Sequence, residues 1–173
     1  AEAGLTSDPV EDADSFEGNA RIKARAAAEA VRAAGLTAAV LADDSGLAVD
    51  ALDGAPGVYS SRYAGADGDD GANNAKLLAE LAAVPDGERT ARFVCTLVFM
   101  DEDGTETVAR GTIEGAIGRE ARGSEGFGYD PLFIPDAFGG ALTLAEVPQA
   151  RKNAVSHRGN ALRALRDSLA SDR

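Results

Sequence analysis

One run, residues 41–65, constrains the fold and chemistry of this chain more than any other. The apolar residues 38–42 predict a short strand that ends at two adjacent carboxylates, Asp43 and Asp44, which Ser45 and a glycine follow. In open α/β sheets, ligands bind where strands end and loops begin. Carboxylates there suit Mg²⁺, which takes one or two of them and keeps water and phosphate as its other ligands. A solvated acidic turn is the alternative interpretation, because Asp, Ser and Gly are also turn residues.

The composition is that of an ordinary globular domain, and it excludes several classes of partner. The chain has 173 residues, 45% of them hydrophobic, which predicts one domain with a sizeable core. Its formal net charge of −12 disfavours non-specific binding to nucleic acid or to an anionic membrane. No apolar stretch is long enough to predict a membrane span. The single cysteine, Cys95, lies in an apolar run, which indicates a buried thiol and a reducing cytoplasm.

Helical and strand patterns alternate along the chain. Asp14 or Ser15 can cap a first helix that runs to about residue 34, with an apolar stripe formed by Ile22, Ala26, Ala30 and Val31. The remaining expected elements are a helix at 72–83, strands at 90–100 and 105–117 with a hairpin turn at 101–104, a glycine-rich loop at 118–131, and one or two helices at 153–170. The alternation predicts an α/β fold, and the hairpin predicts a mixed sheet.

The glycine-rich loop carries a candidate base-binding element, Phe127-Gly128-Tyr129-Asp130. An exposed aromatic ring between glycines forms a stacking platform for a flat base. Gly126 and Gly128 would let the base approach closely, and Asp130 could accept hydrogen bonds from ring N–H groups. The alternative is that Phe127 and Tyr129 are core residues of a strand.

A cluster of basic residues near the C-terminus forms the other candidate binding element. Ser156 is a suitable N-cap, which would leave His157 and Arg158 in the first turn of a helix, where free N–H groups attract anions. Lys152 precedes them by five and six residues. The alternative is that Lys152 and Arg158 are solvated helix charges and that His157 is an ordinary surface or core imidazole.

Four stretches of the chain, in order, resemble the inosine triphosphate pyrophosphatases. These stretches are FEGNARIKAR from Phe16, ADDSGL with GAPG and YSSRYAG within residues 42–65, GFGYDPLF from Gly126, and KNAVSHRG from Lys152. The resemblance extends from about residue 16 to residue 165. It implies a mixed twisted sheet flanked by helices, with two lobes and a central cleft, in a single domain spanning residues 1–173. It also implies a homodimer.

The resemblance further implies an activity, which is the Mg²⁺-dependent conversion of ITP, dITP and XTP to the nucleoside monophosphate and pyrophosphate. Asp44 would orient the attacking water and bind metal, Asp43 would support it or share the metal, and Ser45 would donate to phosphate. His157 and Arg158 would contact the oxygen edge of the purine, and Lys152 would lie near the base or the phosphates. Phe127, Gly128, Tyr129 and Asp130 would form the base-binding loop.

Two departures from the family pattern affect the site. The family normally opens with a strand and a Thr/Ser-x-x-Asn-x-x-Lys phosphate loop, so we expect this chain to lack the first strand and helix. The family often has Phe-x-Glu-Asn, whereas here Gly18 holds the Glu position and Glu17 is one residue off, about 100° around a helix. Glu17 stays a candidate metal ligand beside Asp43 and Asp44. The competing functions are a catalytically impaired nucleotide-binding module and a pyrimidine triphosphate pyrophosphatase of related fold.

Overall fold

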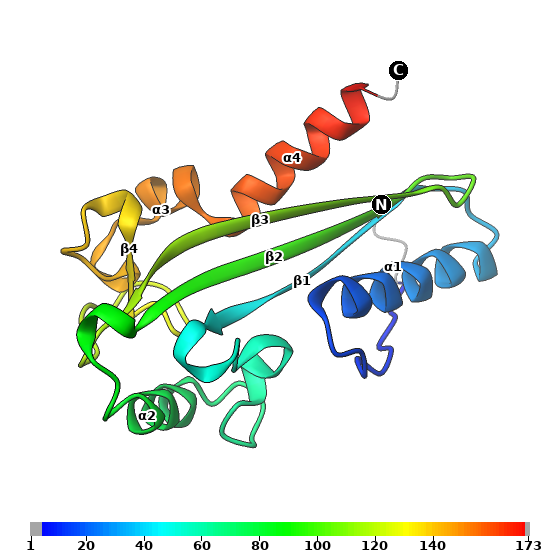
Figure 1. The fold of residues 1–173 in the computed structure, drawn as a ribbon. Coiled ribbons are helices and arrows are strands. Elements are labelled where there is room, and N and C mark those ends of the chain that lie inside the picture. The colour runs from blue at the N-terminus through cyan, green and yellow to red at the C-terminus, as the bar shows by residue number, and fades with distance from the viewer. Residues whose placement is uncertain (1–4, 172–173) are drawn as a thin grey trace.

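A computed structural model describes residues 5–171 of the chain. Its helices and strands are α1 (Phe16–Ala33), β1 (Val40–Val49), α2 (Asp70–Glu80), β2 (Thr90–Met100), β3 (Glu106–Ile117), β4 (Phe133–Pro135), α3 (Gln149–Val155) and α4 (His157–Ser171). The strands form one sheet in the order β1-β2-β3-β4 (Figure 1). No helix among the described residues has the length and hydropathy that crossing a membrane requires. The expected α/β class is confirmed.

Three long antiparallel strands form the framework of the molecule. β1 pairs with β2 over ten residues, β2 pairs with β3 over eleven, and β4 adds three more residues at the far edge. All pairings among the described residues are antiparallel, so this part of the chain supplies none of the parallel pairs of a mixed sheet. Figure 1 shows α4 on one face of the sheet, α1 on the other, and α2 near the end that carries β4.

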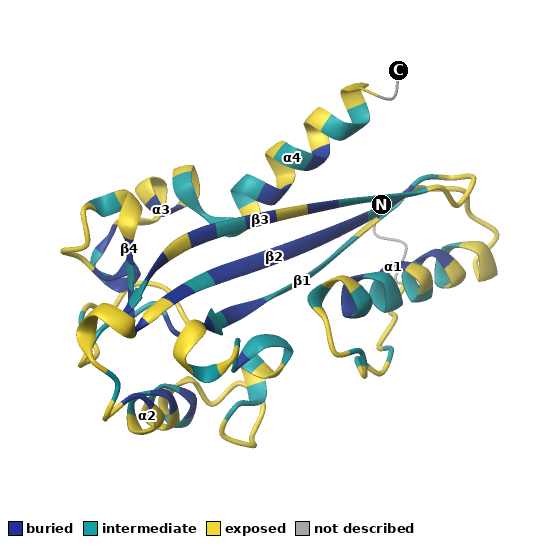
Figure 2. Cartoon of the chain, in the orientation of Figure 1, coloured by how far each residue is buried: buried dark blue, intermediate teal, exposed yellow. Residues whose placement is uncertain are grey.

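The two faces of the sheet follow from the two-residue repeat of a strand. Cys95, Leu97 and Ala109 face α4, where they pack against Ala161 and Leu165. The alternate residues face α1, whose Ala20 and Ala24 pack against Val98 of β2. The central strand β2 is therefore buried along most of its length (Figure 2).

Helix α1 begins as expected but turns a different side inward. The Ser15 side chain caps it by accepting a hydrogen bond from the Gly18 backbone N–H at 3.1 Å. The buried residues of the helix are Asn19, Ala20, Ala24 and Ala28. The stripe expected at Ile22, Ala26, Ala30 and Val31 is only partly buried. Ala20 and Ala24 pack against Val98, with the partly buried Val40, Ala42 and Val108 around them, so the alanine face of the helix is the one in contact with the sheet.

Strand β1 corrects the expectation that the chain leaves the sheet at Ala42. The strand continues to Val49, and its register with β2 is unbroken through Asp43, Asp44 and Ser45. The buried Leu47 and Val49 anchor its second half in the main core. Ten consecutive cross-strand pairs outweigh the local turn preference of Asp, Ser and Gly, because strand preference depends on pairing and burial more than on the isolated residue.

Candidate active site

The two adjacent carboxylates lie on opposite faces of the sheet. Asp44 pairs across the strands with Thr96 on the α1 face, whereas Asp43 pairs with Leu97 on the α4 face. The structure therefore does not bring them together around one cation. Each carboxylate has its own partners, and the pair is separated by the strand that carries it.

Asp44 accepts hydrogen bonds from two side chains of α1. Its Oδ1 lies 2.8 Å from the Lys23 ammonium, and its Oδ2 lies 3.5 Å from the Asn19 amide nitrogen. The same ammonium lies 3.1 Å from the Glu11 carboxylate. Burial raises the pKa of Asp44 and the Lys23 ammonium opposes this rise. Two carboxylates thus converge on one positive charge beside the sheet.

Asp43 holds Arg158 in place. Its Oδ2 accepts hydrogen bonds from Arg158 Nη2 at 2.8 Å, from Arg158 Nε at 3.1 Å and from the Ser45 hydroxyl at 3.1 Å. A guanidinium bonded through two nitrogens has a defined orientation. The structure therefore places Asp43 among the contacts of the C-terminal basic cluster, apart from Asp44.

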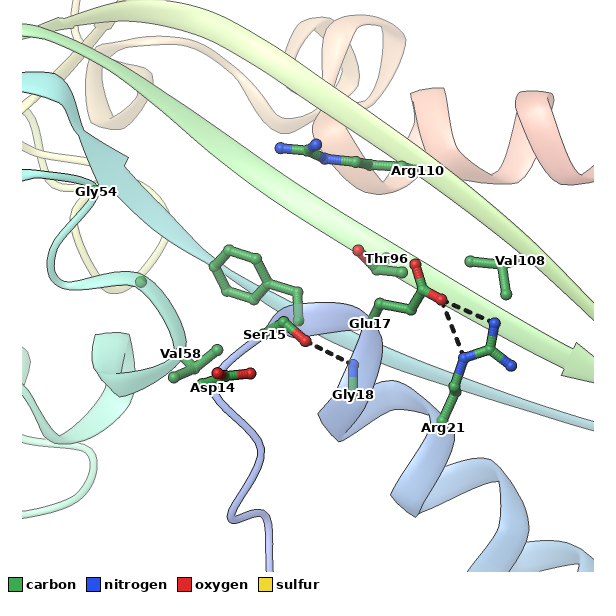
Figure 3. A pocket seen from close by; sticks show the side chains of 12 residues that line it. Asp14, Ser15, Glu17, Gly18, Arg21, Gly54, Val58, Thr96, Val108 and Arg110 are labelled. Carbon is green, nitrogen blue, oxygen red and sulfur yellow. Dashed lines mark hydrogen bonds and ion pairs between the residues drawn. The ribbon is translucent and has the colours of Figure 1, made fainter.

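Glu17 points into a groove between the start of α1 and residues 54–58. The groove has a volume of about 630 Å³, and Figure 3 shows the side chains that line it. The Glu17 carboxylate accepts hydrogen bonds from Arg21 at 2.8 and 3.0 Å. Neither Asp43 nor Asp44 lines this groove, whereas Thr96, which pairs with Asp44 across the strands, does. The role of Glu17 as a metal ligand stays a prediction.

Phe127 stands exposed between two small cavities. Its side chain is 74% exposed, and it lines one cavity of about 230 Å³ and another of about 190 Å³. The flanking Gly126 and Gly128 have φ angles of +90° and +61°, which L residues with side chains rarely adopt. The loop conformation thus presents the aromatic ring to solvent, as a stacking platform requires.

Tyr129 fits the core interpretation better than the base-binding one. It is only 4% exposed and belongs to the main hydrophobic core. Its hydroxyl donates a hydrogen bond to the Ser60 carbonyl oxygen at 2.9 Å, and burial raises its pKa. The ring lines the smaller cavity, but the hydroxyl already has a protein partner.

Asp130 and Lys152 form a buried ion pair at the base of the loop. Asp130 Oδ2 lies 3.1 Å from Lys152 Nζ, and Lys152 is only 6% exposed. Burial raises the pKa of Asp130, and the ammonium opposes the rise. Both residues line the 230 Å³ cavity, so a polar ligand there would meet a carboxylate and an ammonium side by side.

His157 and Arg158 occupy the first turn of α4, as the sequence predicts. The Ser156 hydroxyl caps the helix by accepting a hydrogen bond from the Gly159 backbone N–H at 3.1 Å. The His157 ring stacks on Phe93, with centroids 5.2 Å apart and planes 16° apart. Burial lowers the pKa of His157 to about 4. The imidazole is therefore neutral at pH 7, with one N–H donor and one acceptor nitrogen.

The structure brings most of the expected binding residues to one place. The 190 Å³ cavity is lined by Ser45, Phe127, Gly128, Tyr129, Asp130, His157 and Arg158, and Lys152 lines the adjoining one. The sequence did not point to Glu11 and Lys23, which pair with each other beside Asp44, or to Asp70, which lines the 190 Å³ cavity. Lys23 lies one turn after Asn19 on the inner face of α1, and that spacing is the signal that could have identified it.

Comparison with known proteins gives the same family as the motifs. The Ham1 family model matches residues 2–168. A dITP/XTP pyrophosphatase of Nocardia farcinica is 55% identical over 156 residues, which are 90% of this chain and 72% of the relative. One of Exiguobacterium sibiricum is 52% identical over 92% of this chain and 77% of its own length.

Solved structures agree with the sequence relatives. The Ham1 protein of Staphylococcus aureus superposes with a TM-score of 0.85 at 40% identity, over 96% of this chain and 82% of that one. The Ham1 protein of Coxiella burnetii gives a TM-score of 0.84 at 43% identity, over 95% and 81%. The resemblance to the inosine triphosphate pyrophosphatases is thereby confirmed, and the chain belongs to the Ham1 family.

Proposed function

We propose that this chain is a Mg²⁺-dependent pyrophosphohydrolase that converts ITP, dITP and XTP to the nucleoside monophosphate and pyrophosphate. The observation that carries the proposal is the 190 Å³ cavity, in which an exposed aromatic ring, a neutral imidazole and a guanidinium meet beside strand β1. Relatives about half identical to this chain are dITP/XTP pyrophosphatases, which supports the same reaction class here.

The chemistry of the cavity favours a purine with an oxygen at position 6. Phe127 offers a stacking surface, worth roughly 1–3 kcal/mol for a base. Arg158 can only donate hydrogen bonds, and the neutral His157 has one N–H to donate. A 6-oxo group accepts from such donors, whereas the 6-amino group of adenine would leave one of them unpaired, at a cost of about 1–3 kcal/mol. Pyrimidines would cover less of the Phe127 ring.

The residues around Asp44 fit a divalent cation. Glu11 and Asp44 already place carboxylate oxygens 3.1 and 2.8 Å from one ammonium. Among residues 5–171 no group of three or more His, Cys, Asp or Glu side chains is arranged to hold a metal. A cation held by these two carboxylates would displace the Lys23 ammonium from between them. It would take water and phosphate as its other ligands, which is the coordination Mg²⁺ prefers. We propose Asp44 and Glu11 as these carboxylates in place of Glu17 and Asp43.

Asp44 is also our candidate for the base that orients the attacking water. When bound, Mg²⁺ would supply charge neutralisation on the phosphates. The Asp44 carboxylate would accept a proton from a water aimed at the α-phosphorus, and Asn19 would hold the carboxylate in position through Oδ2. Ser45 lies on the opposite face, beside Arg158, and would donate to the substrate on that side.

Two further properties of the chain are proposals. A homodimer is one, supported by the family resemblance alone. A reducing cytoplasmic location is the other, supported by a single cysteine, Cys95, which is buried as a free thiol. Size-exclusion chromatography with light scattering tests the first, and cell fractionation tests the second.

A substrate panel tests the proposed function. The full chain is incubated with ITP, XTP, dATP and UTP in the presence of Mg²⁺, and kcat/KM is measured for each. We expect ITP and XTP to exceed dATP and UTP by at least tenfold. Preference for UTP would favour the pyrimidine enzyme, and binding of ITP without turnover would favour the impaired binding module; either result would contradict the proposal.

A further inference from the structure

Both backbone polar groups of Gly128 are held by side chains of α2. The Gly128 N–H donates to Asp70 Oδ2 at 2.6 Å, and the Gly128 carbonyl oxygen accepts from Asn74 Nδ2 at 3.0 Å. Asp70 and Asn74 are four residues apart, so they lie on the same side of the helix, one turn from each other. Two side chains of one helix therefore clamp the residue that directly follows Phe127.

Helix α2 is itself firmly anchored. Asp69 caps it by accepting a hydrogen bond from the Ala72 N–H at 2.9 Å. The buried Asn73 accepts from the Ala64 N–H at 2.7 Å and donates to the Ser61 carbonyl oxygen at 3.0 Å. Leu77 is fully buried in the main core. The clamp thus connects the Phe127 loop to a fixed part of the molecule.

Phe127 depends on this connection because packing does not hold its ring. Phe127 is 74% exposed, and it lines both cavities of the candidate site. Gly128 has a positive φ and no side chain of its own to anchor it. The Asn74 carbonyl oxygen, Oδ1, is buried without a hydrogen-bond partner among the described residues. Among the described residues, the Asn74 side chain therefore makes its hydrogen bond through Nδ2, to the Gly128 carbonyl oxygen.

We propose that Asp70 and Asn74 are positioning residues for the aromatic platform, which act on the nucleotide base through Gly128 and Phe127. This inference rests on the proposed function, because it assigns the clamp to base binding. With the clamp in place the ring is pre-ordered for stacking, so the substrate does not have to order the loop when it binds. Loss of the clamp raises KM for ITP and leaves kcat nearly unchanged, because the clamp contacts Gly128, whereas the hydrogen-bond partners of Asp44 are Asn19 and Lys23 of α1.

A mutant series with ITP as substrate tests the proposal. Asp70→Ala and Asn74→Ala each raise KM at least fivefold and change kcat less than twofold. Asp70→Asn keeps an acceptor oxygen for the Gly128 N–H and restores KM to within twofold of the original. The matched control is Asp67→Ala, which removes an exposed carboxylate from the preceding loop and leaves KM unchanged.

A double-mutant cycle shows whether Asp70 acts through the ring. In a Phe127→Ala background, Asp70→Ala has no further effect on KM, because the platform is already gone. If Asp70→Ala raises KM by the same factor in both backgrounds, the residue acts independently of Phe127 and the proposal is wrong. The proposal is also wrong if Asp70→Asn fails to restore KM, or if kcat falls as far as kcat/KM does.

A tryptophan probe tests the clamp without reference to catalysis. The chain has no tryptophan, so Phe127→Trp introduces a single fluorophore at the platform. Adding Asp70→Ala or Asn74→Ala makes the local fluorescence anisotropy decay faster, whereas adding Asp67→Ala does not. If Asp70→Ala and Asn74→Ala leave the anisotropy decay of Phe127→Trp unchanged, the two residues do not order the loop and the proposal is wrong, even if the enzyme is active. If the original chain does not hydrolyse ITP, the proposed function fails, and the anisotropy still decides whether α2 orders the loop.

Discussion

Replacing Gly111 with alanine should separate α4 from the sheet and damage the site at the same time. Gly111 lies on β3, beneath the first turns of α4. A Cβ there would lie well inside 3.0 Å of the His157 carbonyl oxygen and the Ala161 nitrogen, and 2.8 Å from the Asn160 carbonyl carbon. Ordinary contact begins at 3.4 Å. Since the crowded atoms are backbone, the start of α4 must move by about 1 Å, and a shift of that size at a site can cost about 100-fold in rate.

Two measurements check this prediction. Overpacking of this kind costs about 1–3 kcal/mol, so urea unfolding should show that loss together with a fall of about 100-fold in kcat/KM for ITP. Gly87→Ala is the control, because a Cβ at Gly87 meets no atom within 4 Å. If Gly111→Ala has the stability and activity of the Gly87→Ala control, the close packing of α4 on β3 is wrong.

Three further substitutions test individual residues of the site. Asp44→Asn should lower kcat for ITP by about 10²–10⁴-fold, the usual contribution of a general base, while circular dichroism shows an intact fold; near-normal turnover would remove Asp44 from its role. Arg158→Ala should reduce the ratio of kcat/KM for ITP to that for ATP by about 10–100-fold, which corresponds to the free-energy cost of one unpaired buried donor. Equal losses of kcat/KM for both nucleotides would instead indicate that Arg158 binds phosphate or supports the fold. His157→Asn should flatten the pH dependence of the free energy of unfolding. Burial holds the pKa of His157 near 4 in the folded chain, against an ordinary value of 6.5, so between these values the unfolded chain binds one more proton than the folded chain. The free energy of unfolding of the original chain therefore rises with pH by about 3 kcal/mol across that window. Parallel stability curves for the original chain and the His157→Asn variant would contradict this.

Local sequence signals predicted the regular elements well, because those signals and the tertiary structure agree. Ser15 caps α1, and the expected strand 90–100 is β2 to the residue. The region 153–170 becomes two helices that meet at Ser156. The prediction was wrong at β1. The local sequence around Asp43 and Asp44 favours a turn, but both residues pair with β2 within a continuous strand. That pairing depends on residues about 50 positions away, which no local pattern contains.

The sequence predicted which segments form the candidate site, but it did not predict which side chains contact each other there. The Phe127 loop and the His157–Arg158 turn were found because glycines and a helix cap mark them in the sequence. The separation of Asp43 from Asp44 could not be found, since it follows from the strand that replaces the expected turn. The Asp130–Lys152 ion pair and the clamp from Asp70 likewise join distant segments.

The products formed from ITP test the central claim most directly. The full chain is incubated with ITP and Mg²⁺, and the reaction is followed by phosphorus NMR, which separates monophosphate, diphosphate and pyrophosphate signals. The account predicts IMP and pyrophosphate in equal amounts, because water attacks the α-phosphorus. Formation of IDP and inorganic phosphate, or no products at all, would contradict it.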